Sequence, residues 1–280
     1  MTRNSLRLLF LKKTAAFGFV ILVAVVLMAI LAPVIAPYNP YTVSPQALQA
    51  PSSTHLMGTD NLGRDIFSMI LWGARPILFV AALATATSAL LGIVVGAVSG
   101  YFGGKVDDIL MRVTEFFMVI PRFFLALVVV ALWGPKLTTI ALIIGVLSWP
   151  ATARIARSEF LQLREQNFVT AALMAGESTP RTIFSEVLPN ALPAVVTNIA
   201  LGVADAILTY TGFSFLGFGD PNQISWGDLL NEAQPYLINA WWIAVFPGIA
   251  VLLVVLAAVF LGDSFNEILN PRIHSELRKK

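Results

Sequence analysis

The segment FVTAALMAGESTPRTIFSEVLPNALP, residues 168–193, is the longest stretch of mixed polar and small residues in a chain that is otherwise strongly apolar. It is rich in alanine at its start, it contains a glycine at position 176, and three prolines follow that glycine. Apolar runs precede and follow the segment. Its conformation and its purpose depend on what those flanking runs are.

The composition defines the broad class of the protein. The chain has 280 residues, of which 57% are hydrophobic and only 12% are charged. Soluble domains carry about 25% charged residues, so this chain cannot cover a water-facing surface. It contains no cysteine, which excludes disulfides and thiolate metal sites. The net charge is only +2 and the basic residues are not gathered on one polar domain, so we expect no nucleic-acid partner.

Six apolar runs are long enough to cross about 30 Å of hydrocarbon, which takes roughly 20 residues of helix. Backbone groups within lipid must satisfy their hydrogen bonds internally, so these runs are expected to be helices. The sequence therefore predicts an all-α polytopic membrane protein with six transmembrane helices. The predicted spans are residues 14–36, 76–98, 109–133, 137–153, 191–213 and 241–262. The first is predicted to be retained, because its exit sequence LAPVIAPYNP lacks a clean signal-peptide cleavage site.

Basic residues predict the orientation, because they concentrate on the cytoplasmic side of a membrane. Residues 1–13, the tail (264–280) and the loop between the fourth and fifth spans are the basic segments, so both termini are predicted to be cytoplasmic. The basic residues of these segments are Arg3, Arg7, Lys12, Lys13, Arg154, Arg157, Arg164, Arg181, Arg272, Arg278, Lys279 and Lys280. The outer loop is then 37–75, and residues 76–263 form a core domain with the second to sixth spans.

The outer loop is predicted to contain a short helix that lies flat on the membrane surface. Apolar residues recur at helical spacing from Ile66 to Ala74, and Asp60 and Asn61 are good helix starters. His55, Asp60 and Asp65 suggest a metal site, but their spacing fits no known ligand loop. We therefore favour a solvated, capped turn there and predict no metal.

The opening segment is predicted to fold as a helix, a turn and a second helix on the cytoplasmic side. Asn167 is placed to cap a helix through Ala175, and Gly176 suits the position just after the helix end. Thr179 then caps a second helix with proline at its first position, Pro180. The small side chains of the first helix allow another protein to approach closely. The alternative is a loop that only connects two spans.

The segment TAALMAGESTPRTIFSEVLP resembles the EAA loop of ABC-importer permeases. That pattern is Glu-Ala-Ala, three residues, Gly, nine residues and Ile-x-Leu-Pro. The matching residues are Ala171, Ala172, Gly176, Leu188 and Pro189. Thr170 replaces the glutamate and Glu186 replaces the isoleucine. Because the glutamate that could form an ion pair with the ATPase is replaced, the sequence does not identify the polar contact that anchors the loop to its partner.

Four further segments resemble the dipeptide/oligopeptide/nickel permease family, in its C-type subunit. They are HLMGTDNLGRDIFSMILWGAR, WPATARIARSEFLQLREQNFVTAA, GFSFLGFGDPNQISWGDLL and LGDSFNEILNPR, in order between about residues 55 and 272. The resemblance implies a bacterial inner-membrane protein that works with a homologous second permease, two ABC ATPase subunits and an extracytoplasmic substrate-binding protein. It also implies that ATP and magnesium bind the ATPases and that this chain binds no cofactor.

The same resemblance assigns roles to residues. The loop at 157–190 would dock into an ATPase through Thr170, Ala171, Ala172, Gly176, Leu188 and Pro189, and would transmit ATP-driven closure to the helices. Peptides are the family's commonest solutes, but nickel, metal–chelator complexes and sugars use similar permeases. The solute is therefore left open.

Enzymes and free-standing channels are the competing classes. The segment SGYFGGKVDD is a near miss for a P-loop, because Ser99 stands where glycine belongs and Val106 follows Lys105. ATP hydrolysis is therefore assigned to partners. An intramembrane hydrolase needs a serine–histidine pair, two aspartates or a metal within the spans, but His55 and His274 lie outside them. A free-standing channel has no evident use for the folded loop.

Two intramembrane charges and one outer segment complete the candidate sites. Arg122 and Asp205 lie 13 and 14 residues into their spans, which places both about 20 Å along straight helices. A lone charge there is costly, so we predict that the two line a pathway and interact. The alternative is that Arg122 reaches the surface and Asp205 is protonated or bonded to backbone.

The segment GFSFLGFGDPNQISWGDLL is predicted to fold back at the outer surface. The binding protein would then contact Gly217, Gly219, Asp220 and Trp226. The alternative is a simple connector.

Overall fold

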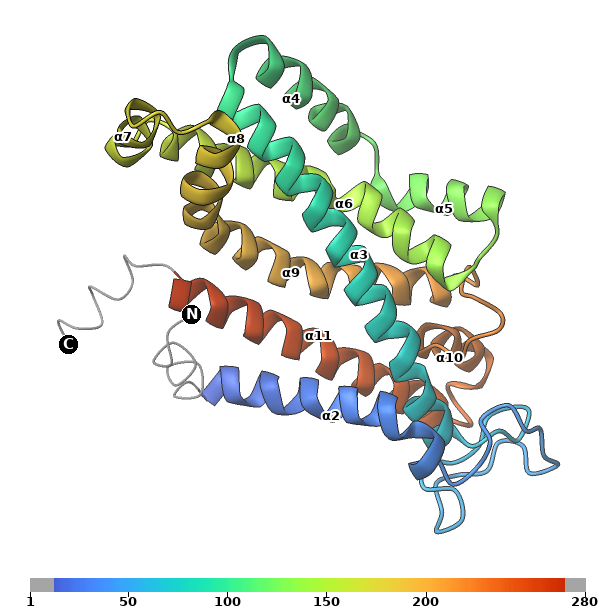
Figure 1. The fold of residues 1–280 in the computed structure, drawn as a ribbon. Helices are drawn as coiled ribbons and strands as arrows, with labels where there is room; N and C mark the ends of the chain where they lie inside the picture. The colour runs from blue at the N-terminus through green and yellow to red at the C-terminus, as the bar shows by residue number, and fades with distance from the viewer. Residues whose placement is uncertain (1–12, 270–280) are drawn as a thin grey trace.

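A computed structural model describes residues 13–269 of the chain (Figure 1). Within that range the protein is helical, with no strand and one isolated bridge between Thr59 and Asp65. The α-helices are α2 (Lys13–Ile35), α3 (Ile66–Phe102), α4 (Gly104–Val119), α5 (Arg122–Trp133), α6 (Leu137–Leu163), α7 (Asn167–Met174), α8 (Thr179–Arg181), α9 (Leu188–Phe215), α10 (Trp226–Ala233) and α11 (Trp242–Leu269). A π-helix, η1 (Thr182–Val187), joins α8 to α9, and a 3₁₀-helix, η2 (Gln234–Tyr236), follows α10.

The membrane spans predicted from hydropathy are present. Five helical stretches are long and apolar enough to cross a bilayer, and the bent pair α4–α5 makes a sixth. The all-α polytopic fold class is therefore confirmed, with five candidate spans, or six when the bent pair counts as one span. The predicted N-terminal segment and most of the predicted tail lie outside the described residues.

The third span is broken, which corrects the prediction of one helix over residues 109–133. α4 and α5 meet at an angle of 81°. Ile120 has an extended backbone, with φ −75° and ψ 127°, and Pro121 precedes α5. Proline has no N–H to donate and disfavours helical geometry in the residue before it, so the helix ends at Val119 and restarts at Arg122.

The predicted surface helix of the outer loop is wrong. Residues 66–74 form the first turns of α3, which continues through Pro76 into the second span. Asp65 caps this helix by accepting a hydrogen bond from Ser68 N, a role assigned from sequence to Asp60 and Asn61. The apolar face that looked suited to a lipid surface is buried in the protein, and Ile66 is 0% exposed.

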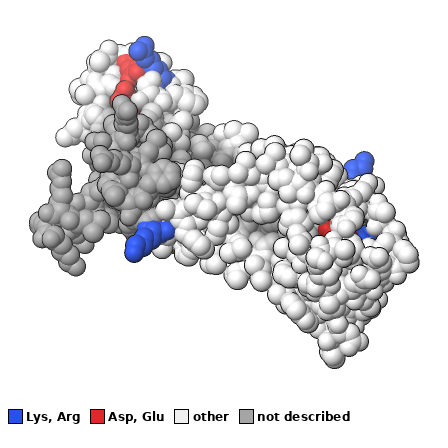
Figure 2. Space-filling model, turned by 90° about the horizontal axis from the view of Figure 1, so that it is seen from below, with Lys and Arg blue, Asp and Glu red and all other residues white. Residues whose placement is uncertain are grey.

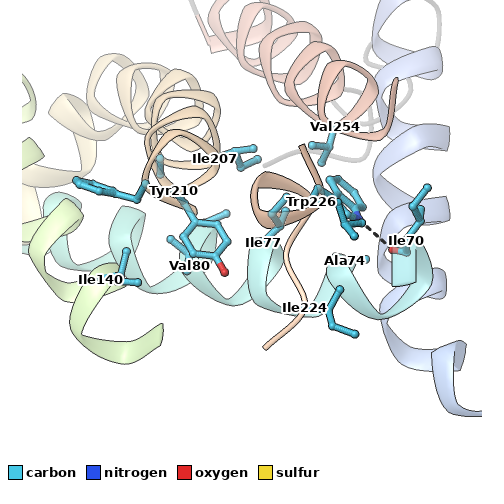
Figure 3. Packing of buried hydrophobic residues seen from close by; sticks show 14 of the residues in the cluster. Ile70, Ala74, Ile77, Val80, Ile140, Ile207, Tyr210, Ile224, Trp226 and Val254 are labelled. Atoms are coloured by element: carbon cyan, nitrogen blue, oxygen red, sulfur yellow. Dashed lines mark hydrogen bonds between the residues drawn. The ribbon is translucent and has the colours of Figure 1, made fainter. Parts of the chain in front are cut away.

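The main hydrophobic core explains that burial (Figure 3). Trp226 of α10 lies against α3, and its indole Nε1 donates a hydrogen bond of 3.0 Å to the carbonyl of Ile70. A side chain at Gly73 would come within 2.6 Å of the Trp226 ring. The core continues along α3 and α9 through residues such as Ile77 and Ile207. α10 is therefore packed into the bundle.

The outside of the bundle is apolar. Val20, Ile30 and Val34 of α2 are 64%, 64% and 83% exposed. Figure 2 shows a face on which charged side chains lie toward the ends and the stretch between them is uncharged. Such a surface suits contact with lipid.

Candidate functional site

A cavity of about 250 Å³ with both polar and apolar lining residues lies among α3, α6 and α9. Its polar lining residues come from helices that are far apart in the sequence. They are Thr85 and Ser88 of α3, Ser148 and Thr152 of α6, Asn198 and Asp205 of α9, and Arg122 at the start of α5. Asn198 Nδ2 donates a hydrogen bond of 3.1 Å to Thr152 Oγ1, so the cavity wall joins α9 to α6.

Arg122 and Asp205 contact each other at the edge of this cavity. Arg122 Nη1 lies 3.2 Å from Asp205 Oδ2 and 3.4 Å from Ser148 Oγ. The two charged side chains are 50% and 46% exposed. Similar depths along two straight helices were predicted for these residues, but the helix that carries Arg122 is broken at Pro121. The break brings Arg122 to the start of α5, where it reaches Asp205.

A second, smaller cavity of about 70 Å³ shares residues with the first. Arg122, Ile144 and Ser148 line both spaces. Phe123 lines the smaller one, and its ring stacks on Phe213 with centroids 4.7 Å apart. The Arg122 side chain therefore borders both spaces, and an aromatic stack lies beside them.

Residues 168–193 lie at the end of the bundle opposite α10 (Figure 1). Gln166, one residue before the predicted cap Asn167, precedes α7. The helix ends at Met174, Ala175 is its C-cap, and Gly176 follows with φ +85°. Gly176 N bonds to Leu173 O and Glu177 N bonds to Ala172 O, which is the hydrogen-bond pattern of a Schellman motif. The prediction that Gly176 follows the helix end is confirmed.

The second half of the segment departs from the prediction. Ser178, rather than Thr179, precedes the next helix, and Pro180 lies in its first turn. The second helix of the segment is also not separate from the span that follows it. α8, η1 and α9 together form one helical run, Thr179–Phe215. The six-residue π-helix η1 ends at Val187, directly before Leu188 and Pro189.

One face of α7 is anchored and another is open. Val169 is 1% exposed and packs with Phe160, Val187 and Ala191 in a small second core. Thr170 and Ala171 are exposed, Ala172 is half-buried, and Met174 is 86% exposed. Leu188 packs against the same small core, so its side chain supports the loop from within. The open face of α7 therefore combines the small side chains of Thr170 and Ala171 with larger apolar ones, Leu173 and Met174.

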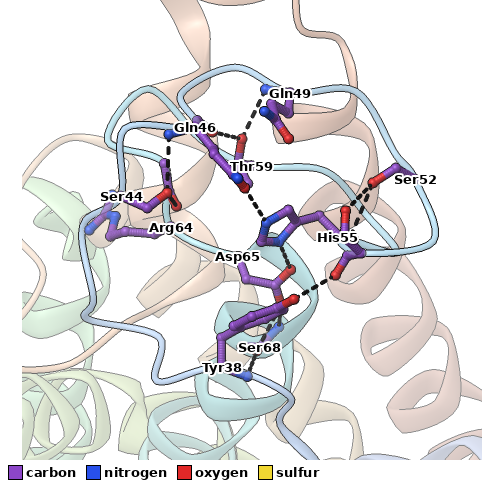
Figure 4. Close-up of polar contacts among 12 residues, drawn as sticks. Tyr38, Ser44, Gln46, Gln49, Ser52, His55, Thr59, Arg64, Asp65 and Ser68 are labelled. Atoms are coloured by element: carbon purple, nitrogen blue, oxygen red, sulfur yellow. Dashed lines mark hydrogen bonds and ion pairs between the residues drawn. The ribbon is translucent and has the colours of Figure 1, made fainter.

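At the opposite end, the loop between α2 and α3 forms a dense polar network (Figure 4). His55 Nδ1 lies 2.9 Å from Asp65 Oδ1, and His55 Nε2 lies 3.1 Å from Gln46 Oε1. Arg64 bonds to both Asp60 and Glu232. His55, Asp60 and Asp65 are buried, so the predicted solvated turn is in fact a buried one. Among residues 13–269, no group of acidic and histidine side chains is arranged to hold a metal ion.

The segment between α9 and α10 folds back beside this network, as predicted. Gly217 turns the chain with φ +83°, and Asp220 Oδ2 accepts a hydrogen bond of 2.9 Å from Leu137 N. Gly217, Gly219 and Asp220 line a cavity of about 300 Å³. Trp226 is 0% exposed, so its side chain is not available to the partner for which the sequence suggested it.

Two carboxyl groups of α10 also line this outer cavity. Burial raises the pKa of Asp228 to about 6, although hydrogen bonds from Ser225 act in the opposite direction. Burial likewise raises the pKa of Glu232, against the lowering effect of Arg64. For both Asp228 and Glu232, burial is the largest influence on the pKa of the carboxyl group.

Membrane-spanning helices around a cavity that contains charged and polar groups, with an exposed helical loop at one end, are typical of a membrane transport protein of the permease class. Residues 92–275 match the family of binding-protein-dependent transport system inner membrane components, and the chain belongs to that family. Residues 1–51 match the N-terminal transmembrane domain of oligopeptide transport permease C. The protein is therefore a multi-pass protein of the bacterial inner membrane.

Several relatives match along almost their whole length. The dipeptide transport system permease protein DppC of Escherichia coli K12 is 38% identical over 269 residues, which cover 93% of this chain and 90% of that protein. DppC of Alkalihalophilus pseudofirmus is 34% identical over 275 residues, covering 98% and 90%. The di/tripeptide permease DppC of Pseudomonas aeruginosa is 32% identical over 269 residues, covering 93% and 89%.

Sequence reasoning did not identify the polar groups that complete the cavity. Ser88, Ser148 and Asn198 sit in apolar spans, where single hydroxyl and amide groups are common. Only the fold shows that they share one space with Arg122 and Asp205. A regular spacing on one helix would have signalled them, but they come from three helices.

Proposed function

We propose that the chain is one membrane subunit of an ATP-driven importer of di- or oligopeptides. The relatives that match nearly its full length are named dipeptide and di/tripeptide permeases, and this carries the substrate class. ATP hydrolysis belongs to two ATPase subunits. A homologous second permease completes the pathway, and an extracytoplasmic binding protein delivers the solute.

In this proposal α7 is the helix that docks into an ATPase. Its exposed face of Thr170, Ala171 and Met174 presents small and apolar groups to a groove, while Val169 holds the helix to the bundle. The Schellman motif at Gly176 stiffens the exit from α7. A stiff loop transmits the closure of the ATPase pair. The end that carries α7 is then cytoplasmic, as are both termini.

The cavity beside Arg122 and Asp205 is the proposed solute pathway. A peptide at neutral pH carries an ammonium and a carboxylate group. Asp205 and Arg122 offer the complementary charges, and their single contact leaves donors and acceptors free for a solute. Ser148 and Asn198 supply neutral hydrogen-bonding groups. The same wall would suit a neutral sugar or a metal–chelator complex less well, because neither needs both charges.

The outer face is the proposed contact for the binding protein. The exposed turn at Gly217 and Asn222 lies beside the polar loop between α2 and α3, since Tyr41 Oη donates a hydrogen bond of 3.4 Å to Asn222 O. The contact surface therefore combines both loops. Buried Trp226 supports it from below and is not part of it.

ATP-dependent uptake is the test. The chain is purified with its co-expressed partner subunits and reconstituted into liposomes, and uptake of a labelled dipeptide is measured with and without ATP and binding protein. We expect co-purification of ATPase subunits and uptake that needs both additions. Ala171→Trp should abolish stimulated hydrolysis, whereas the conservative control Ala171→Ser should not. Uptake without ATP, or normal ATPase association in Ala171→Trp, would contradict the proposal.

A further inference from the structure

A second ion pair lies away from the cavity, at the turn between α3 and α4. Arg157 of α6 makes a two-pronged contact with Asp107 of α4, with Nε 2.5 Å from Oδ1 and Nη2 2.6 Å from Oδ2. Ser99 of α3 donates a further hydrogen bond to the same carboxylate. Asp107 is 8% exposed and Ser99 is 0% exposed. One carboxylate thus joins three helices.

A second arginine closes the same turn. Arg164, at the end of α6, donates hydrogen bonds of 3.2 Å from Nη1 to the carbonyls of Gly100 and Tyr101. These carbonyls belong to the last turn of α3, where the backbone C=O groups have no N–H donors within the helix. Two arginines of α6 therefore bind the cytoplasmic end of α3 and the start of α4.

The backbones of α3 and α6 are in direct contact beside this turn. A methyl group added at Gly92, Gly96 or Gly100 would lie 2.5 Å from Thr152 Cβ, 2.6 Å from Ala156 Cβ and 2.7 Å from Phe160 Cβ, respectively. Glycines four residues apart let membrane helices approach this closely. The contact leaves no room for one helix to slide past the other without breaking the packing.

This clamped pair of helices reaches both functional regions of the chain. Toward α7, Phe160 of α6 packs with Val169 in the small second core. Toward the cavity, Thr152 lies five residues before Arg157 on α6 and lines the wall. That separation is about 7.5 Å along a helix. The ion pair therefore lies between the docking helix and the cavity.

We infer that the Asp107–Arg157 pair is a positioning element that makes the α3–α4 turn, α6 and α7 move together and so carries the movement of α7 to the cavity wall. The inference rests on the proposed function, in which α7 receives the movement of an ATPase. A two-pronged arginine contact suits this task because it fixes orientation as well as distance. Without it, α7 could move while the cavity helices stay in place.

The ratio of peptide molecules imported to ATP molecules hydrolysed tests this inference in the full reconstituted transporter. We expect Asp107→Asn to hydrolyse ATP but to import about 10-fold fewer peptides per ATP, in the range of measured coupling between sites. Arg157→Lys keeps the positive charge but cannot make the bidentate contact, so it should lower the ratio of peptides imported to ATP hydrolysed by less than Asp107→Asn does. Ser99→Ala removes one hydrogen bond from a packed helix and serves as a mild variant that keeps the fold. Asp108→Asn, an exposed neighbour, is the matched control.

A role confined to folding predicts a different pattern. The yield of assembled transporter would fall, but the ratio in the assembled fraction would equal that of the wild type in Asp107→Asn, Arg157→Lys and Ser99→Ala. That result would overturn the inference while leaving the proposed function intact. If the wild-type complex imported no peptide on ATP addition, the proposed function would fail, and this inference with it.

Discussion

Two arginine–aspartate pairs, Asp107–Arg157 (the closed pair) and Asp205–Arg122 (the open pair), differ in how fully their hydrogen-bonding groups are used. Asp107 receives both prongs of Arg157 and the hydroxyl of Ser99, and it is almost completely buried. Asp205 receives one nitrogen of Arg122 at 3.2 Å, and both side chains are about half exposed. The closed pair has little capacity left for another molecule. The open pair keeps free donors and acceptors beside a cavity.

An arginine–aspartate pair in this bundle therefore has two distinct uses. A buried, saturated pair fixes the geometry of the helices that it joins, and breaking it leaves an uncompensated charge. A half-exposed pair contributes little to stability and is free to exchange its partner for a solute. Both pairs consist of an arginine and an aspartate, so residue type does not distinguish the two uses. The burial of the aspartate and the number of hydrogen bonds that it accepts distinguish them.

The largest expected effect is on stability at the closed pair. Asp107→Ala should lower the free energy of unfolding by about 1–3 kcal/mol, because Arg157 loses its counter-charge while its side chain, 34% exposed, keeps partial access to water. Asp205→Ala should lower it by less than about 1 kcal/mol, as for exposed pairs. Thermal unfolding of both variants in detergent measures the contrast. Equal shifts of the transition temperature would remove the physical basis of the comparison.

The next effect concerns transport at the open pair. Arg122→Asp and Asp205→Arg should each reduce peptide uptake about 10-fold or more, since each leaves two like charges at the cavity, while the double exchange should exceed the worse single variant. Initial rates of ATP-driven uptake over a range of peptide concentrations measure this. Harmless single variants, or a double variant no better than the worse single one, would remove support for a direct pair.

A smaller effect is expected at the loop next to the closed pair. Gly176 has φ +85° with open space around it, so Gly176→Ala strains the backbone by roughly 1–2 kcal/mol without a steric clash. The strain should loosen the exit of α7 and lower peptide import per ATP a few-fold. Gly248→Ala in α11, where the nearest side chain is 3.9 Å away, is the matched control and should be neutral. A normal ratio in Gly176→Ala would show that coupling does not need this geometry.

The smallest effect is a pH dependence at a third carboxyl group, Asp228, whose side-chain hydrogen bond comes from Ser225 rather than from an arginine. Burial raises its pKa to about 6, so the folded state holds this proton more tightly than the unfolded state, where the pKa is close to its ordinary value. Asp228 should therefore add stability as pH falls from about 6 to about 4, and that contribution is lost as pH rises through 6.

Asp228→Asn should remove this dependence, and Asp108→Asn, an exposed carboxylate, should retain it. Transition temperatures between pH 4 and pH 8 report the slope. An unchanged slope in Asp228→Asn would assign the dependence to another group.

The parts of the fold that sequence predicted are those set by local chemistry. Hydropathy placed the spans, and the need for a positive φ after α7 identified Gly176. The break at Pro121 was missed because membrane helices tolerate proline when neighbouring groups satisfy the freed backbone. The continuation of residues 66–74 into α3 was missed because burial against Trp226 and exposure to a lipid surface both call for an apolar helix face.

The sites were predictable to a lesser degree. Arg122 and Asp205 were found because a charge in an apolar span is costly, and their contact is present despite the bent helix. Asp107 and Arg157 are 50 residues apart and lie at span ends, where charged residues are ordinary. Their pairing depends on the close approach of α3 and α6, which only the tertiary structure shows.

Two serines offer the most direct test of the difference between the two ion pairs. The Ser148 hydroxyl contacts Arg122 of the open pair, and the Ser99 hydroxyl contacts Asp107 of the closed pair. The chain has no native cysteine, so a single introduced thiol can be labelled specifically. Ser148→Cys and Ser99→Cys are reconstituted separately with the partner subunits, and the rate of labelling by a hydrophilic thiol reagent is measured with and without dipeptide. We predict that Ser148→Cys is labelled and that the peptide slows the reaction, while Ser99→Cys stays unlabelled. Labelling of both at similar rates, or reaction of Ser148→Cys only with a lipophilic reagent, would contradict the account of an open, water-filled pathway and a closed structural pair.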